Sequence, residues 1–288
     1  MYTALAPYAI GVHAPDVQEA IAAARSGGFE GVEFRADQVA DLVEEHGAPH
    51  VQNLFADAGV RPAGWSLPTD WRGSEATWRS DLEKLPRLAA AAAAIGCPRT
   101  MTWVLPSSDE HSFEENYDFH VERFTPIAQI LSDHGCRLGL EFVGTKTLRD
   151  SRRYPFIYRM ADMLAMSAEI GPNVGLLLDC WHWYTSGGTL DELGELRSEQ
   201  VVYVHVNDAP TGLLVEEQVD TVRALPGETG VIDITGFLQA VHSSGYDGPV
   251  APEPFKQDLG SLPSDAARLQ IVGAAMERVF RQAGLRGG

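Results

Sequence analysis

Amphipathic stretches alternate along the chain with short, nearly continuous apolar runs. In the amphipathic stretches the apolar residues recur with the spacing of one helix face, and a glycine-containing turn often leads into the next apolar run. The pattern predicts eight strands, which begin near residues 8, 31, 61, 99, 137, 174, 201 and 248. Helices are predicted at 16–28, 36–47, 78–96, 119–135, 158–171, 190–200, 234–245 and 265–284.

Strands and helices that alternate in this way are typical of a parallel sheet whose outer face is covered by helices. Eight such units in 288 residues favour a closed (β/α)8 barrel, the TIM barrel of the α/β class. A doubly wound sheet is disfavoured because no linker divides the chain and no G-x-G-x-x-G motif follows the first predicted strand. We therefore expect residues 1–288 to form a single catalytic barrel domain.

The bulk composition is that of a folded globular protein with an excess of acids. Hydrophobic residues make up 44% of the chain and charged residues 22%. The net charge of -18, from 40 acids against 22 Lys and Arg, repels polyanions and argues against nucleic-acid binding. The opening MYTALAPYAIGVHAP lacks the basic and long apolar segments of a signal peptide or membrane span, so we expect a cytoplasmic protein.

Side chains that can bind metals stand at the carboxyl ends of the last four predicted strands. They are Glu141, Asp179, His205 and Glu253. Each alone has a simpler explanation, such as a helix cap or a buried core residue. In a closed barrel, however, these strand ends converge on one mouth, where three carboxylates would repel one another without a cation. We therefore predict that the four residues bind one divalent metal, with a solvated rim of acids as the alternative.

The chemistry of the four side chains narrows the choice of metal. Three carboxylates and one imidazole, without a thiolate, favour Mn²⁺, and Co²⁺, Mg²⁺ and Zn²⁺ remain alternatives. Such a set leaves coordination positions open for water or for a chelating substrate. The three cysteines are widely spaced beside apolar runs, which predicts reduced thiols in the core.

The residues around the four predicted ligands resemble the xylose-isomerase-like TIM-barrel superfamily over essentially the whole chain. The matching stretches are LEF with Glu141, LLLDCWH with Asp179 and His182, YVHVND with His205, and PEPF with Glu253. The superfamily holds sugar phosphate isomerases and epimerases, ketose 3-epimerases and inosose dehydratases. The resemblance implies that Glu141 and Glu253 bind metal and act as an acid/base pair on the two faces of the substrate. It also implies that His182 holds a substrate oxygen.

Three further positions are compared with branches of that superfamily. The stretch PGETGVID, 226–233, is similar to a loop of inosose dehydratases and related isomerases, which implies that Glu228 faces the site. Val143 stands where classical xylose isomerases have a lysine, so a two-metal hydride shift is not expected. Thr211 stands where ketose 3-epimerases often carry an arginine, so the substrate of that branch cannot be assigned to this chain.

The predicted chemistry is proton transfer next to a carbonyl group. A metal chelated by the ketone oxygen and a neighbouring hydroxyl would stabilise the enediolate that forms when one glutamate removes a proton. Return of the proton gives epimerisation or isomerisation, whereas loss of a β-hydroxyl gives elimination. We expect an isomerase or epimerase of a sugar or keto-sugar, with phosphorylated and inositol-derived substrates included. The alternatives are a lyase, of the inosose dehydratase kind or acting on a 3-keto-sugar or C-glycoside, and a non-catalytic sugar-binding barrel.

Further substrate-binding candidates stand near the predicted strand ends. Flat rings there can pack on the C–H face of a sugar, although plain core packing is the alternative for each. The further candidates for binding the substrate are Trp65, Trp103, Trp181 and His13. The expected partner is a small sugar, keto-sugar or cyclitol, not a nucleic acid or a membrane, and a homo-oligomer is left open.

Overall fold

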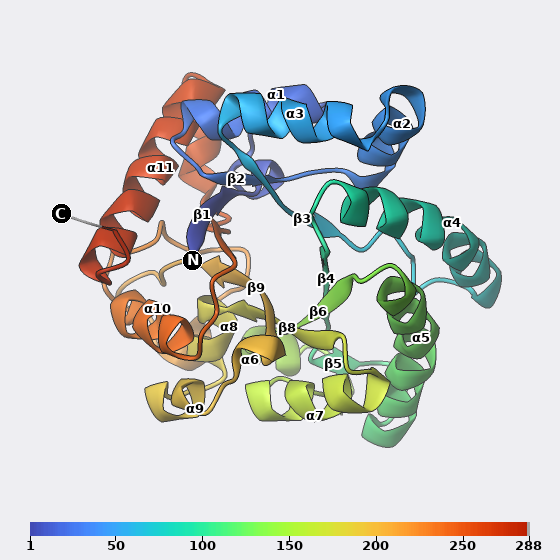
Figure 1. Cartoon of the computed structure of the whole chain (residues 1–288). Coiled ribbons are helices and arrows are strands. Elements are labelled where there is room, and N and C mark those ends of the chain that lie inside the picture. The colour runs from blue at the N-terminus through green and yellow to red at the C-terminus, as the bar shows by residue number, and fades with distance from the viewer. Residues whose placement is uncertain (287–288) are drawn as a thin grey trace.

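Eight parallel strands close into a barrel that is surrounded by helices (Figure 1), in a computed structural model that describes residues 1–286. The strand order around the barrel is β1-β10-β9-β8-β6-β4-β3-β2. The predicted α/β TIM barrel is therefore confirmed. The barrel strands are β1 (Tyr2–Leu5), β2 (Gly31–Glu33), β3 (Arg61–Ser66), β4 (Arg99–Val104), β6 (Arg137–Phe142), β8 (Val174–Asp179), β9 (Val201–Val206) and β10 (Pro249–Pro252).

Helices follow the strands and cover the outside of the barrel. The longer ones are α1 (Val17–Ser26), α2 (Ala36–His46), α3 (Ala48–Ala58), α4 (Glu75–Ala94), α5 (Phe113–Asp133), α7 (Met160–Ile170), α10 (Ile234–Ser243) and α11 (Asp265–Gln282). Shorter elements are α6 (Lys146–Arg149), α8 (Cys180–Thr185), α9 (Leu190–Gly194), and the two-stranded antiparallel sheet of β5 (Ser107–Ser108) and β7 (Tyr154–Pro155). Side-chain caps begin several of the helices, for example Asp16, which accepts a hydrogen bond from the backbone of Glu19 at 2.8 Å.

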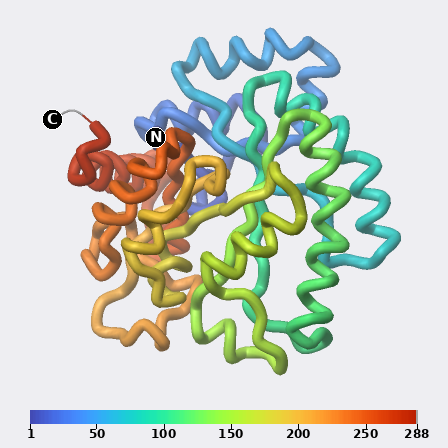
Figure 2. The backbone as a smooth tube through the Cα atoms, turned by 60° about the horizontal axis from the view of Figure 1, so that its bottom comes forward, coloured from blue at the N-terminus to red at the C-terminus, as the bar shows by residue number. Residues whose placement is uncertain are grey.

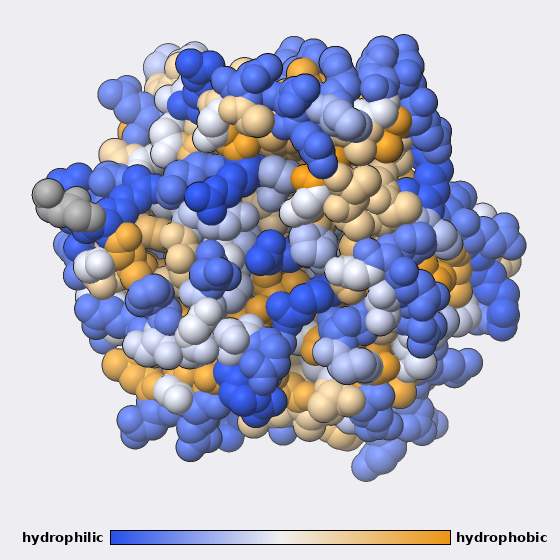
Figure 3. All heavy atoms as spheres, viewed as in Figure 1, coloured by the Kyte–Doolittle hydropathy of each residue, from blue (hydrophilic) through white to orange (hydrophobic). Residues whose placement is uncertain are grey.

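The ring of helices closes where the last helix meets the first. α11 packs against α1, and β1 pairs in parallel with β10, so Arg286, just after α11, reaches β1 and donates to the Thr3 hydroxyl at 3.1 Å (Figure 2). Hydrophilic side chains cover most of the rim in the view of Figure 3, with apolar side chains between them in small groups. Within the described part of the chain, no helix combines the length and apolarity needed to cross a membrane.

Alternation along the strands separates two apolar layers. The larger layer lies between the strands and the helices, and a smaller cluster contains Leu177, Tyr203 and Ala251. A side chain at Gly64 would come within 2.8 Å of the Tyr203 ring, so this glycine makes room for the large aromatic side chain in the barrel. Because successive side chains point to opposite faces, residues two positions further along a strand share the inner face.

The first strand is a correction to the sequence analysis. We predicted it at residues 8–12, whereas β1 spans Tyr2–Leu5 and a 3-10 helix occupies Pro7–Ile10. β1 has only four residues, one of them a polar threonine, which gives it a weak apolar signal, and its parallel pairing to both β2 and β10 identifies it as a strand. Pro7 starts the 3-10 helix and Gly11, with a φ of 68°, ends it. As a result Tyr8 lies at the carboxyl end of the barrel.

Two helical segments also differ from the predictions. α3 was not predicted, and Pro49 stands in its first turn, where a proline is tolerated because the backbone donor there has no partner within the helix. The helix predicted at 190–200 is limited to α9 and a 3-10 turn at Ser198–Gln200. The remaining predicted helices overlap the observed ones, with ends that differ by a few residues.

Candidate active site

The four predicted metal ligands lie together at the carboxyl end of the barrel. Their ligand atoms are all within 4.8 Å of one another, and all four residues are buried. Each residue is two positions beyond an inner position of its strand: Glu141 after Gly139, Asp179 after Leu177, His205 after Tyr203 and Glu253 after Ala251. The barrel geometry therefore directs these side chains to one place, which we call the acidic cluster.

His205 is at the centre of the acidic cluster. Its Nδ1 lies 3.4 Å from Glu253 Oε2 and 3.7 Å from Glu141 Oε1, and its Nε2 lies 3.8 Å from Glu33 Oε1. These separations exceed ordinary hydrogen-bond distances. Both imidazole nitrogens and Glu141 Oε1 have no hydrogen-bond partner among residues 1–286. Buried polar atoms without partners are costly, so the donor set fits a divalent cation held between these side chains.

Charges within the cluster shift its pKa values in different directions. Burial raises the pKa of Glu141 above its ordinary value. Burial would also raise the pKa of Glu253, but His205 and Arg223 outweigh it and lower that pKa to about 2. Burial opposes the charged form of His205, yet Glu253 and Glu141 raise its pKa well above the usual value. The cluster thus strongly favours positive charge beside its carboxylates.

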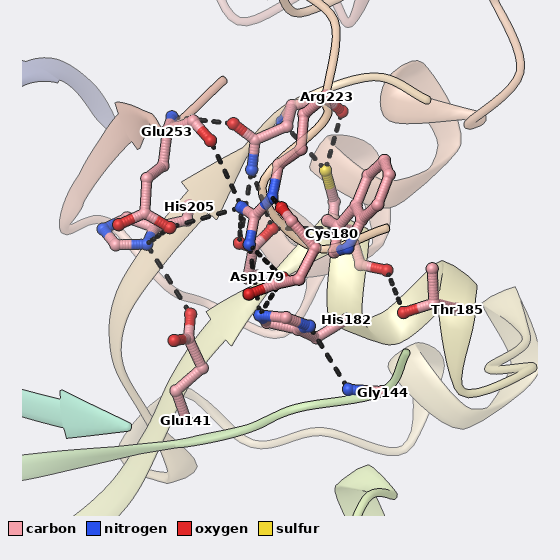
Figure 4. Close-up of polar contacts among 12 residues, drawn as sticks. Glu141, Gly144, Asp179, Cys180, His182, Thr185, His205, Arg223 and Glu253 are labelled. Atoms are coloured by element: carbon pink, nitrogen blue, oxygen red, sulfur yellow. Dashed lines mark hydrogen bonds and ion pairs between the residues drawn. The ribbon is translucent and has the colours of Figure 1, made fainter. Parts of the chain in front are cut away.

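Arg223 is a buried cation of the site that the sequence analysis missed. Its Nη1 donates to Asp179 Oδ2 at 2.8 Å and to Glu253 Oε2 at 3.2 Å. Its Nη2 donates to Asp220 Oδ1 at 2.8 Å and lies 3.3 Å from His182 Nε2 (Figure 4). These acids raise the pKa of Arg223 although burial opposes the charge. Arg223 belongs to the long loop between β9 and α10, so no strand pattern indicated its position.

Asn207 and the backbone hold Asp179 in one orientation. The Asn207 Nδ2 donates to both Asp179 oxygens, at 3.1 and 3.2 Å, and Asp179 Oδ1 also accepts from the Trp181 backbone at 2.8 Å. The Asn207 Oδ1 accepts from the Glu253 backbone at 2.8 Å, which links β9 to β10. Such outer hydrogen bonds orient metal-binding carboxylates.

Asp208, next to Asn207, has a different role from the cluster acids. Its carboxylate accepts backbone hydrogen bonds from Thr229 at 3.0 Å, Gly230 at 2.8 Å and Ile232 at 3.0 Å. These bonds fasten the returning end of the loop that carries Arg223. The acid therefore organises the loop rather than the acidic cluster.

A cavity of about 580 Å³ opens over the acidic cluster, and we call it the metal cavity. Glu141, Glu253, Arg223 and two of the predicted substrate-binding residues line it. One of these is His182, which is buried, and its Nδ1 accepts a hydrogen bond from the Gly144 backbone at 3.2 Å. The other is Trp103, which is 46% exposed and packs its ring against the guanidinium of Arg72 at 3.9 Å.

Three of the other predicted substrate-binding residues, Trp65, Glu228 and His13, do not line the metal cavity. Trp65 is fully buried in the core, and its Nε1 donates to the Cys97 carbonyl at 3.4 Å. The Glu228 carboxylate pairs with Lys256 at 3.0 Å. His13 lines a separate cavity of about 710 Å³, which we call the second cavity.

Aromatic rings hold Arg223 in place. The ring of Trp181, which is fully buried, lies 5.3 Å from its guanidinium carbon, and that of Phe255 lies 4.9 Å from it. Trp181 thus contacts a residue of the site rather than lining the metal cavity itself. Phe255 lines the metal cavity and has a φ of 39°, a strained value for a residue other than glycine.

Tyr8 and Glu33 are two more residues of the mouth that the sequence analysis missed. The Tyr8 hydroxyl donates to Glu253 Oε1 at 3.1 Å, and burial of this hydroxyl end beside Glu33 raises the pKa of Tyr8 well above its usual value, although the residue as a whole is 56% exposed. Tyr8 was missed because the first strand was misplaced. Glu33 ends β2 in GVEF, much as Glu141 stands in GLEF, and this likeness could have found it.

Known proteins resemble this chain over most of its length. A family model described as xylose isomerase-like TIM barrel matches residues 21–279. The inosose isomerase of Halalkalibacterium halodurans is 21% identical over 245 residues, which are 83% of each chain. The 3-dehydroshikimate dehydratase of Pseudomonas aeruginosa is 28% identical over 256 residues, which are 88% of this chain and 38% of that protein. The structure of a xylose isomerase domain protein from Alicyclobacillus acidocaldarius has a TM-score of 0.85 at 32% identity and covers 99% of both chains. The chain belongs to the xylose isomerase-like TIM barrel family.

Proposed function

We propose that the chain is a divalent-metal-dependent isomerase or epimerase of a sugar, keto-sugar or cyclitol, with Glu141 and Glu253 as its acid/base pair. The observation that carries the proposal is the acidic cluster at the base of the metal cavity, where four buried ligand atoms lie within 4.8 Å of one another. The cavity of about 580 Å³ is large enough for a sugar ring. Isomerase and dehydratase relatives are consistent with this class of reaction.

The acidic cluster would hold the metal through Glu141, Asp179, His205 and Glu253. A bound divalent metal supplies positive charge that stabilises the negative charge developing on substrate oxygens. We favour Mn²⁺ because three carboxylates and one imidazole suit it, with Co²⁺, Mg²⁺ and Zn²⁺ as alternatives.

The two glutamates would move the proton. Glu141 and Glu253 reach the cluster from β6 and from the end of β10, on either side of His205 (Figure 4). A sugar carbon between them would therefore meet one carboxylate on each face. The ionised glutamate removes the proton next to the carbonyl, and the other returns a proton.

Arg223 and His182 would bind the substrate oxygen that becomes negatively charged. Arg223 Nη2 and His182 Nε2 are 3.3 Å apart on the wall of the metal cavity. Hydrogen-bond donors fixed in a dry site stabilise developing charge without reorganising during the reaction. Here Arg223 would supply the charge that Thr211 cannot supply.

A lyase is the second candidate, because the Pseudomonas aeruginosa relative at 28% identity is a 3-dehydroshikimate dehydratase. Elimination needs the same proton removal next to a carbonyl, followed by loss of a β-hydroxyl. The same cluster can therefore perform it, and the product distinguishes the two reactions.

Solvent exchange tests the proposal. Ketoses, keto-sugars and inososes are incubated in D₂O with the Mn²⁺-loaded protein and followed by NMR. We expect deuterium at the carbon next to the carbonyl in at least one compound, and none after the metal is removed with a chelator. The signals of the product then separate an epimer, an isomer and a dehydrated compound. If no substrate exchanged, the proposed proton transfer would be wrong.

A further inference from the structure

The barrel mouth contains a second space beside the one over the metal ligands. The second cavity, of about 710 Å³, lies between the loops that follow β1, β2 and β3 and the helix α4. It is no smaller than the metal cavity of about 580 Å³. A single sugar ring in the metal cavity would leave this neighbouring space without a ligand.

The two cavities meet at three residues. Tyr8, Ser66 and Leu67 line both of them. Tyr8 as a whole residue is 56% exposed, while its hydroxyl reaches Glu253 in the acidic cluster. The Tyr8 ring is therefore a flat partition between the cavities, over which a ligand in the metal cavity can extend.

The floor of the second cavity combines apolar side chains with one buried acid. Val12, Phe34 and Leu88 supply the apolar surface. Glu33 lines the cavity and is 5% exposed, with its Oε1 directed toward His205 Nε2 at 3.8 Å. A carboxylate that lines a cavity can accept a hydrogen bond from a hydroxyl group of a ligand, and it repels an anion.

The two cations at the rim of the second cavity, Arg35 and Lys84, are already paired. Arg35 binds Asp37 at 2.6 Å, and Lys84 binds Asp81 at 2.9 Å. These cations are thus compensated, so the rim does not favour a phosphate or another anion. The lining favours a neutral ring that has an apolar face and at least one hydroxyl.

We propose that the substrate carries a second, neutral ring joined to the reacting sugar, and that this ring binds in the second cavity. The inference rests on the proposed function for the ring in the metal cavity. It names the substrate class as a glycoside-like compound rather than a free monosaccharide. Glu33 accepts a hydroxyl of the second ring, and Tyr8 packs against the bond between the two rings.

Three matched compounds test this inference with the Mn²⁺-loaded enzyme. They are methyl 3-keto-β-D-glucoside, 4-hydroxyphenyl 3-keto-β-D-glucoside and 3-ketocellobiose, which differ in the group attached to the same sugar. Binding is measured by quenching of tryptophan fluorescence, and turnover by deuterium exchange in D₂O. We expect Kd to be at least about tenfold lower for one of the two-ring compounds than for the methyl compound. The aryl and the sugar derivative show which kind of ring the cavity prefers.

A cavity-filling variant gives a second measurement. Ala14 lines the second cavity, so Ala14→Trp should bring the ratio of the affinities for two-ring and methyl compounds close to one. Ala56→Trp places the same side chain on an exposed position of α3 and should leave that ratio unchanged. A cooperative thermal unfolding transition serves as the check that both variants are folded.

The outcomes separate the two proposals. Equal affinities for all three compounds, or no binding of any, would overturn the second-ring inference. An affinity ratio between two-ring and methyl compounds that stays unchanged in Ala14→Trp would overturn it as well. Binding with the expected preference but without deuterium exchange would contradict the proposed reaction and leave the second cavity as a ring-binding site.

Discussion

The two halves of the barrel mouth hold their polar groups in different ways. In the half formed by β6, β8, β9 and β10, four ligand side chains and Arg223 make a dense buried network. In the half formed by β1, β2 and β3, Glu33 is a single buried acid, and the rim charges are paired with one another at the surface. Buried charges are stable only next to compensating charges, so they concentrate in one half. Under the proposed function, one half would carry out the reaction and the other would select the substrate.

Substitution of Glu253 should have the largest effect on activity, because Glu253 is the proposed base and a proposed metal ligand. Glu253→Gln should lower the rate of deuterium exchange by about 10³-fold or more, since the variant loses both the base and one metal ligand. Asp258→Asn changes an exposed acid nearby and is the matched control, with an expected rate close to that of the unchanged protein. Full exchange activity in Glu253→Gln would show that the acid/base assignment is wrong.

Substitution of Arg223 should lower activity less than that of Glu253, and metal binding should be retained or become tighter. Arg223→Gln removes a donor to the substrate oxygen, so we expect kcat to fall about 10²-fold. The same change removes a cation 2.8 Å from Asp179, so Mn²⁺ should bind at least as tightly as before in calorimetry. Arg223→Lys keeps the charge and should recover part of kcat. Loss of metal binding in Arg223→Gln would instead show that Arg223 maintains the shape of the cluster.

Glu33 tests the other half of the mouth with the same chemical change. Glu33→Gln keeps the size of the side chain and removes a charge 3.8 Å from His205 Nε2. If Glu33 binds the second ring as proposed, kcat/KM should fall by about tenfold or less, mainly through KM. A loss as large as that of Glu253→Gln would contradict the division between the two halves.

The candidate ligands were predictable because the fold determines where they lie. The end of each parallel strand reaches the same mouth, so an acid or histidine at the end of β6, β8 or β9 needs no knowledge of the loops. Tyr8 and Arg223 lie on loops, whose paths depend on contacts between distant residues, such as those of Asp208 with residues 229–232. Their positions could not be inferred from local pattern alone.

A shift of one residue along a strand explains the different outcomes for the tryptophans. Gly64 faces Tyr203 inside the barrel, so Trp65 points outward into the helix layer. Trp103 is two positions after Met101, which belongs to the inner cluster, and it therefore reaches the metal cavity. The sequence alone placed both near strand ends but did not determine which face each would occupy.

The last prediction concerns stability rather than activity, in the pH range in which the two halves can be compared. His120 is buried against Trp71 and Phe156, with ring centroids 4.9 Å away in both cases, and its Nδ1 donates to the Asn116 carbonyl at 2.6 Å. Burial lowers the pKa of His120 to about 4. Since an unfolded histidine has a pKa of about 6.5, the unfolded chain takes up this proton first as the pH falls.

The folded state should therefore lose stability between about pH 6.5 and pH 4, by up to about 3 kcal/mol from this residue. His120→Gln does not titrate, so its free energy of unfolding, measured with urea at pH 7 and pH 4.5, should fall less than that of the unchanged protein. His242→Gln, at an exposed position, is the control and should behave like the unchanged protein. Equal losses of stability in all three proteins would show that His120 does not titrate in this range.

Protonation of His120 would also affect the metal cavity. His120 packs on Trp71, and Arg72 packs on both Trp71 and Trp103, which lines that cavity. An acidic loss of activity that persists in His120→Gln would therefore belong to the carboxylates of the mouth.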